Sequence, residues 1–303
     1  MSVQAMQARD GATAATSAIR VTPTGAAVGA RVEGVDLRAG VNPEQLHTIV
    51  DALGRFGMLY FPGQDLDDES LMAFSRLFGS ELDIHALTQF AKPGHPEIFV
   101  LSNIVENGRP LGASDAAQYW HTDLSYSPTP SRVSLLYALK VPQDETGPLG
   151  DTEFASTAQA YADLNASTKA LVAGRRAFHD AKKVKPRPGS HFTRPLSVDV
   201  DQRLQQVSHP IVRTHKDSGA QCLYVNEGFT TAIDGLPPEE GRALLHRLFD
   251  HMTQPRYIYR HKWQTHDLVM WDNCLTIHQG IPNYGPHQPR LMNRTIVKGE
   301  VPF

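Results

Sequence analysis

Several features that would point to particular classes of protein are scarce in this chain. It has only two cysteines, Cys222 and Cys274, in 303 residues and no Cys-x-x-Cys pair. That excludes a disulfide framework and favours a reducing cytoplasm. The formal net charge of −3 gives no reason to expect binding to nucleic acid or to an anionic membrane. No apolar run approaches the roughly 18 residues that a membrane helix needs, so we predict a cytoplasmic protein that binds neither.

The common signatures of nucleotide and hydrolase sites are missing as well. The sequence contains no GxGxxG and no GxxxxGK[ST], the glycine-rich patterns that cradle phosphates. It also lacks the GxSxG turn of serine hydrolases and the HExxH pair of zinc proteases. The chemistry of the chain must therefore come from another arrangement of side chains.

The pattern of elements predicts a mainly β protein with flanking helices. Residues 1–20 are rich in Ala, Ser, Thr and Gly without a continuous apolar stretch, so we expect a flexible tail, followed by one domain over residues 21–303. Helical patterns cover residues 42–57, where Asn42 can cap and Pro43 can begin the helix, as well as 67–79, 157–179 and 236–254. Short strands dominate the C-terminal third, which favours a β-sandwich or jelly roll.

A His-x-Asp pair can supply two ligands to one metal ion, and the chain contains two such pairs. With 14 histidines, chance alone can produce this spacing. His215 and Asp217 lie in "THKDSGAQ", a polar turn, where a structural role is expected. His121 and Asp123 lie in the aromatic stretch "YWHTDLSY", and on a strand these two side chains would point to the same face.

A metal bound by this pair needs a third ligand, and His278 in "WDNCLTIHQG" is the best candidate. Two histidines and one carboxylate form the facial triad of non-haem Fe(II) oxygenases, which leaves positions open for co-substrate and O₂. The residues alone leave open a half-buried His and Asp satisfied by their neighbours. Arg290 and Arg294 follow His278 by 12 and 16 residues, and two arginines beside a metal would suit two anions.

Taken in order, these segments resemble the taurine dioxygenase/TfdA family of Fe(II)- and 2-oxoglutarate-dependent dioxygenases. The resemblance extends over roughly residues 20–303 and comprises His278, Arg290, Arg294 and the segments "GVDLR", "LYFPGQ", "AFSRLFG", "WHTD", "GDTEF" and "DLVMWDN". It implies a double-stranded β-helix, that is, a jelly roll. It also implies Fe(II) held by His121, Asp123 and His278, with 2-oxoglutarate and O₂ as co-substrates.

The same resemblance assigns roles around the metal. It implies that Thr152 and Arg290 bind 2-oxoglutarate and that Arg294 holds the acidic group of the substrate. For Arg294, a second contact to 2-oxoglutarate or a structural ion pair remains an alternative. His85 and Tyr126 are further candidates for substrate contacts, although His85 also suits a supporting role and Tyr126 also suits the core. Cys274 is interpreted as a small buried hydrophobe.

The substrate is expected to be a small organic acid with an apolar group: a carboxylate, sulfonate or sulfate ester. Where taurine dioxygenase has an asparagine for the substrate amine, this chain has Ala117, which argues against taurine. Phe90 and Phe192 are candidate pocket residues, and the basic loop 181–193 is a candidate lid. Family members are often dimers or tetramers, so we expect a homo-oligomer. The alternatives are a metal-dependent hydrolase or a non-enzymatic metal-binding jelly roll that uses the same triad.

Overall fold

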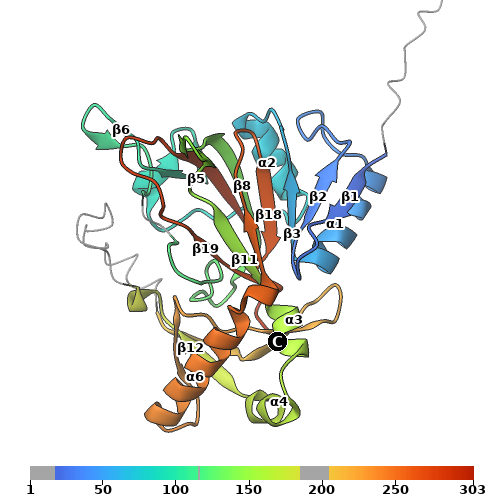
Figure 1. Ribbon diagram of the computed structural model, residues 1–303, viewed down its shortest axis with the longest axis vertical. Coiled ribbons are helices and arrows are strands. Elements are labelled where there is room, and N and C mark those ends of the chain that lie inside the picture. Colours follow the sequence, from blue (N-terminus) through green and yellow to red (C-terminus); the bar gives the residue numbers. More distant parts are fainter. Residues whose placement is uncertain (1–17, 115–116, 185–204) are drawn as a thin grey trace, which may run out of the picture.

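An eight-stranded sheet forms the centre of the protein (Figure 1). The computed structural model describes residues 18–114, 117–184 and 205–303, so the tail predicted over residues 1–20 lies almost entirely outside the described residues. The strands of this sheet, in spatial order, are β1 (Arg20–Pro23), β2 (Ala30–Glu33), β3 (Met58–Phe61), β18 (Leu268–Asp272), β8 (Ser131–Lys140), β20 (Leu291–Lys298), β5 (His95–Ser102) and β4 (Ala91–Lys92).

Both faces of the large sheet are buried, because alternate residues of its central strands pack into two different cores. On β8, Leu135 and Tyr137 face one core and Leu136 faces the other, as the two-residue period of a strand requires. β18 behaves in the same way, with Met270 and Trp271 on opposite faces. This arrangement explains why both strands are continuous apolar runs in the sequence.

Two helices cover one face of the large sheet. Helix α1 (Pro43–Phe56) begins with the predicted cap, in which the Asn42 side chain accepts the Gln45 N–H, and ends at Gly57 in the left-handed region (φ 71°). Helix α2 (Asp68–Arg76) is capped by Asp67. Their apolar faces belong to the first core, so both helices pack on the outer face of the large sheet.

The other face packs against a smaller sheet that carries the site described below. Its three strands are β17 (Ile258–His261), β11 (Thr152–Ser156) and β19 (Thr276–Gly280), with β11 in the middle. Phe154 of β11 packs with Leu136 and Trp271 of the large sheet in the second core. Two facing sheets, antiparallel except for the parallel β2–β3 pair, with helices outside confirm the predicted jelly-roll class.

A third group of elements lies below the sandwich in Figure 1. It contains α3 (Thr157–Ala162), α4 (Ala166–Val172), α6 (Pro238–Met252) and a sheet of β13 (Val207–Pro210), β12 (Arg176–His179) and β16 (Thr230–Ile233). The helical prediction for residues 157–179 was therefore wrong at its end. The last four residues form β12 because β13 and β16 flank them and satisfy their backbone groups.

The remaining elements are short. They are the hairpins β6 (Val105–Glu106) with β7 (Arg109–Pro110), β9 (Gln143–Asp144) with β10 (Gly147–Pro148) and β14 (Val212–Thr214) with β15 (Gln221–Leu223), and the 3₁₀ turns Thr88–Phe90, Ala181–Lys183 and Pro255–Tyr257. Among the described residues, no helix combines the length and apolar character needed to cross a membrane.

Two buried histidines in the third group predict loss of stability in acid. His179 on β12 and His209 on β13 are 0% and 2% exposed, and burial lowers the pKa of His179 to about 3 and that of His209 to about 4. Unfolding restores ordinary pKa values near 6.5. Their contribution to stability is therefore fully present above that pH and is lost as the pH falls toward 4, by about 1.4 kcal/mol per pH unit per histidine.

Urea unfolding between neutral pH and pH near 5 should show this slope. His179→Phe should reduce it, because phenylalanine fills the same space and takes up no proton. The exposed His246→Phe on α6 is the matched control and should leave the slope unchanged. An identical slope in wild type and His179→Phe would contradict the assignment.

Candidate metal and co-substrate site

The two histidines of the predicted triad are joined through their backbones. His121 forms an isolated antiparallel bridge with His278 on β19, in which each N–H donates to the other carbonyl (3.0 and 2.9 Å). Asp123 lies in the turn that follows. The proposed reason for the pairing of His121 and Asp123, a shared strand face, was therefore wrong. A bridge followed by a turn brings the two side chains together instead.

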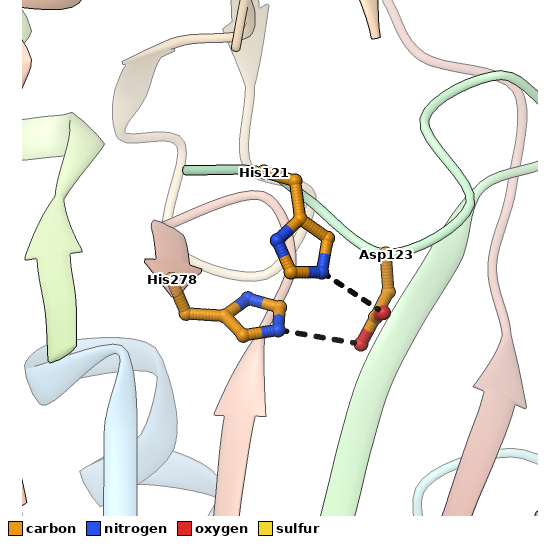
Figure 2. Close-up of side chains that lie close together, drawn as sticks. All are labelled: His121, Asp123 and His278. Atoms are coloured by element: carbon orange, nitrogen blue, oxygen red, sulfur yellow. Dashed lines mark ion pairs between the residues drawn. The ribbon is translucent and has the colours of Figure 1, made fainter. Parts of the chain in front are cut away.

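The three side chains converge on one point (Figure 2). The Nε2 atoms of His121 and His278 lie 3.7 and 3.9 Å from the two different oxygens of Asp123, and all three ligand atoms are within 4.8 Å of one another. These separations are too long for hydrogen bonds. They fit three donors that each stand about 2.0–2.2 Å from a shared ion. All three residues are buried, with 3–4% of their surface exposed.

The protonation states of the triad suit a cation. Burial alone would raise the pKa of Asp123, but Arg294 and the two imidazoles outweigh it and hold that pKa well below its ordinary value. Burial, together with His121, keeps the pKa of His278 well below its ordinary value. The site therefore offers a carboxylate and a neutral imidazole at neutral pH, the forms that bind metals.

A network of buried hydroxyl and amide groups holds Asp123 in place. Ser134 donates to Asp123 Oδ2 (2.7 Å), and the Asn273 side chain accepts the Asp123 backbone N–H (3.2 Å). Asn273 also donates to Ser131 and Ser134. Apart from the "WDN" segment, no sequence pattern indicated these contacts, because Asn273 and Asp123 are 150 residues apart.

Asn273→Ala is expected to weaken metal binding by about 10- to 100-fold, since it frees the carboxylate ligand to move. It should also lower the free energy of unfolding by about 1–3 kcal/mol, because the buried Asp123 N–H loses its acceptor and the Ser131 and Ser134 hydroxyls lose a donor. Metal titration and urea unfolding measure the two effects. Asn103→Ala is the matched control: Asn103 accepts the Arg290 N–H (2.8 Å) and contacts no triad residue, so metal affinity should be retained. Equal metal affinities in both variants would contradict the role of Asn273.

The His121 ring is oriented by its own chain and by a glycine. Its Nδ1 lies 2.9 Å from the Tyr119 carbonyl, so Nδ1 carries the proton and Nε2 is left as the free donor atom. Gly228 packs directly beneath this segment and donates its N–H to the Trp120 carbonyl (3.0 Å). A Cβ at Gly228 would stand 2.6 Å from the Tyr119 ring and 3.1 Å from His121 Cβ.

Gly228→Ala should therefore push the His121 segment away and weaken metal binding by about 10-fold or more, which metal titration would measure. The control is Gly241→Ala in helix α6, where the nearest heavy atoms are 3.7 Å from the new Cβ. That control should bind metal as the wild type does. Unchanged metal affinity in Gly228→Ala would show that the segment yields without disturbing the ligand.

The predicted co-substrate residues lie next to the triad. Thr152 faces Gly280 and Phe154 faces His278 across the β11–β19 pair, which puts Thr152 and His278 on the same face of the small sheet, in diagonal positions. The Thr152 hydroxyl accepts the Trp263 indole N–H (3.0 Å). Its own proton remains available to donate to a ligand.

Arg290 lies just before β20 and close to the start of β11. A Cβ on Gly150 would stand 3.3 Å from Arg290 Nε, so the guanidinium rests against the chain two residues before Thr152. Its backbone is held by Asn103, which accepts the N–H (2.8 Å), and by Ser102, which donates to the carbonyl (2.8 Å). Arg290 Nε is buried and has no hydrogen-bond partner, which leaves a fixed cation ready for an anion.

The substrate candidates Arg294 and His85 pack on the same aromatic ring. The Arg294 guanidinium carbon is 5.0 Å from the Phe99 centroid, and the His85 ring is 4.1 Å from it. Arg294 also donates to Asp123 Oδ1 (3.1 Å), the ion pair that was an alternative for this residue. Tyr126 packs edge-on against Phe229 (4.8 Å), and Phe229 in turn contacts the His121 ring (5.9 Å).

The other candidates from the sequence occupy structural positions in the fold. His215 pairs with Asp272 (3.2 Å) and Asp217 with Arg132 (2.8 Å), so the second His-x-Asp pair does not converge. Cys274 is buried, as predicted. Phe90 is 4% exposed and belongs to the second core.

The candidate lid is only partly described. Phe192 and most of the loop 181–193 lie outside the described residues. Lys183 lies inside them and donates to the carbonyls of Glu227 and Thr230, so its ammonium is already bound to the protein.

Comparison with known families identifies the group to which this site belongs. The model of the family described as "Taurine catabolism dioxygenase TauD, TfdA family" matches residues 20–296. The chain belongs to the TauD/TfdA family. It is an oxidoreductase of the α-ketoglutarate-dependent dioxygenase class, and 2-oxoglutarate and a metal are the requirements of that class.

Relatives within the family act on different compounds. The α-ketoglutarate-dependent 2,4-dichlorophenoxyacetate dioxygenase of Burkholderia sp. (strain RASC) is 32% identical, and the match covers 82% of this chain and 84% of that protein. The α-ketoglutarate-dependent sulfate ester dioxygenase of Pseudomonas putida is 29% identical, with 93% and 90% covered. Family membership therefore defines the reaction class and leaves the substrate open.

Solved structures agree with the fold. A taurine dioxygenase from Burkholderia xenovorans superimposes with a TM-score of 0.77 at 31% identity, over 94% of this chain and 90% of that one. The structure of AAD-2 in complex with Mn(II) and N-oxalylglycine gives a TM-score of 0.77 at 32% identity, over 94% and 98%. Because these similarities cover 94% of this chain, the jelly-roll fold of the family extends over nearly all of it.

Proposed function

We propose that this TauD/TfdA protein is an Fe(II)- and 2-oxoglutarate-dependent dioxygenase that hydroxylates a small organic acid with an apolar group. The main support for the proposal is that the ligand atoms of His121, Asp123 and His278 lie within 4.8 Å of one another. Iron held by these three residues would supply the oxidising chemistry by which O₂ converts a substrate C–H to C–OH while 2-oxoglutarate becomes succinate and CO₂. The residues of the chain hold the reactants, orient them and exclude water.

The co-substrate end of the site favours a dicarboxylate. Arg290 offers a half-buried guanidinium whose Nε is buried without a partner, and Thr152 offers a hydroxyl proton on the face that carries His278. Together they would grip the carboxylate of 2-oxoglutarate that lies far from the metal. The alternative, a metal-dependent hydrolase with the same triad, has no use for this pair of groups.

The acidic group of the substrate would meet Arg294 and His85 above Phe99. Burial lowers the pKa of His85 to about 3, so its ring is neutral, and its Nδ1 accepts the Leu87 N–H (3.1 Å). The proton therefore sits on Nε2, which becomes a hydrogen-bond donor for an anion. A neutral donor beside a guanidinium suits a carboxylate, sulfonate or sulfate ester.

The apolar part of the substrate would lie against Tyr126 and Phe229 next to His121. Ala117 has a positive φ of 67°, and its carbonyl accepts the Gly280 N–H (2.8 Å). With a methyl group as its side chain, Ala117 cannot bond a substrate amine, so we expect the substrate to lack one at this place. The homo-oligomer, the cytoplasmic location and the single domain over residues 21–303 remain parts of this proposal.

Succinate formation with matched pairs of compounds tests the proposal. Each pair contains an acid (aryloxyacetate, alkyl sulfate or alkyl sulfonate) and its neutral ester or amide. We expect Fe(II)-dependent succinate formation to rise with the acid of at least one pair and to stay at the background level with its neutral partner. His85→Phe, which leaves every triad residue intact, should raise the KM for the acid more than it lowers kcat. Equal stimulation by the acids and their neutral partners would contradict acid recognition.

A further inference from the structure

A cavity lies away from the triad, where β14, the β18–β19 turn and the end of β20 meet. Its volume is about 290 Å³. Its walls are strongly polar, with four basic side chains (Arg132, Arg213, Lys216 and Lys298) and three acidic ones (Asp217, Asp272 and Glu300). None of these residues belongs to the metal or co-substrate site described above.

Each of the three acidic groups of the cavity already has partners of its own. Asp217 pairs with Arg132 (2.8 Å) and Glu300 with Lys216 (2.8 Å). Asp272 accepts from His215 (3.2 Å) with one oxygen and from the Cys274 and Leu275 N–H groups with the other. The remaining basic residue at the rim, Lys298, pairs with Glu81 (3.1 Å).

Arg213 is the basic residue of the cavity that forms no ion pair within 4.0 Å in the described part of the chain, although the charges of Asp272 and Glu300 act on it at longer range. It is only 5% exposed, and its Nε and Nη1 are buried without a hydrogen-bond partner. The guanidinium stacks on the Tyr224 ring at 4.8 Å, and in the described part of the chain it forms no ion pair. A buried, unpaired charge is costly in a folded protein, whereas a bound anion would compensate it.

We infer that this cavity is a binding site for a small oxyanion, held by the Arg213 guanidinium. The planar fork of an arginine matches the oxygens of a phosphate, sulfate or carboxylate group. The cavity volume is at the lower end of the range for small-molecule sites, so it suits inorganic phosphate or sulfate, or a small metabolite that carries such a group.

The cavity lies next to a residue that supports one of the metal ligands. Asp272 lines the cavity, and the next residue, Asn273, accepts the Asp123 backbone N–H on the other side of the same turn. The oxyanion site is nevertheless distinct from the 2-oxoglutarate site, because no residue is shared. The two can therefore be tested separately.

Thermal unfolding and calorimetric titration of the full chain with inorganic phosphate, against sodium chloride at equal ionic strength, test the inference. At a hundredfold excess over the dissociation constant, phosphate should raise the Tm of the wild type by about 4 °C. Arg213→Met should abolish the response and should melt higher than the wild type without phosphate, since it removes the unpaired charge. Arg213→Lys should bind phosphate several-fold more weakly because the fork is lost.

Two matched variants distinguish Arg213 from the arginines elsewhere in the protein. Arg290→Met should keep the full phosphate response, which separates this cavity from the co-substrate site. The exposed Arg242→Met on α6 should behave as the wild type. An equal phosphate response in wild type and Arg213→Met would overturn the inference, and so would the absence of phosphate binding in the wild type. If Arg213→Met melts at a lower temperature than the wild type without phosphate, the guanidinium has a structural role in its contact with Tyr224 instead.

Discussion

His278→Ala should lose metal-dependent turnover by about a thousandfold or more, because the remaining His121 and Asp123 cannot hold a catalytic metal alone. His278 is buried between aromatic rings, with Trp271 at 4.6 Å and Phe154 at 5.9 Å, so no nearby polar side chain can take its place. Metal content after dialysis and the rate of succinate formation measure the effect.

The matched control for His278→Ala is His246→Ala, which removes an exposed histidine of α6. That variant should keep its metal and its activity. Since truncation also leaves a small cavity in the second core, the folded state of His278→Ala should be verified by circular dichroism. A folded His278→Ala protein that retains metal with wild-type affinity would remove His278 from the proposed ligand set.

Arg290→Met should raise the KM for 2-oxoglutarate by about 30- to 1000-fold, the usual cost when one partner of a buried charge pair is removed. Metal affinity should not change, because Arg290 contacts Tyr284 and the Gly150 turn rather than the triad. Arg290→Lys keeps the charge but loses the planar fork, so its KM should lie between those of the wild type and the methionine variant.

Steady-state kinetics at saturating Fe(II) separate this prediction from general damage. Arg242→Met on the surface of α6 should leave the KM unchanged. If the KM for 2-oxoglutarate in Arg290→Met stays within a few-fold of the wild type, Arg290 does not bind the co-substrate. The hydrolase alternative, which needs no dicarboxylate, would then be favoured.

Local patterns in the sequence were sufficient for most elements and for the choice of triad residues. Asn42 and Pro43 marked the start of α1, and apolar runs marked β3, β8 and β18, because caps and burial on both faces leave their signal within a few residues. The triad was found by combining one His-x-Asp pair with a histidine on a distant strand. The ordered resemblance to the family then separated this pair from the one at His215.

Contacts between distant segments could not be read from the sequence. The backbone bridge of His121 to His278, the Asn273 contact with Asp123 and the Trp263 bond to Thr152 each join residues more than 100 positions apart. The helical pattern over residues 157–179 failed at its end for the same reason, since β13 and β16 pair with that segment only in the folded chain. Arg294 was expected to face the substrate, and only the structure shows its bond to Asp123.

An anaerobic titration of the Fe(II)-loaded protein with 2-oxoglutarate, followed by visible absorption, would decide whether the triad is an iron site that binds this co-substrate. Chelation of 2-oxoglutarate to iron at the triad predicts a weak charge-transfer band that saturates at one equivalent in the wild type. The band should be absent in His278→Ala and should need far more 2-oxoglutarate in Arg290→Met. A wild-type spectrum that does not change on addition of 2-oxoglutarate, with Fe(II) bound, would contradict the proposed dioxygenase site.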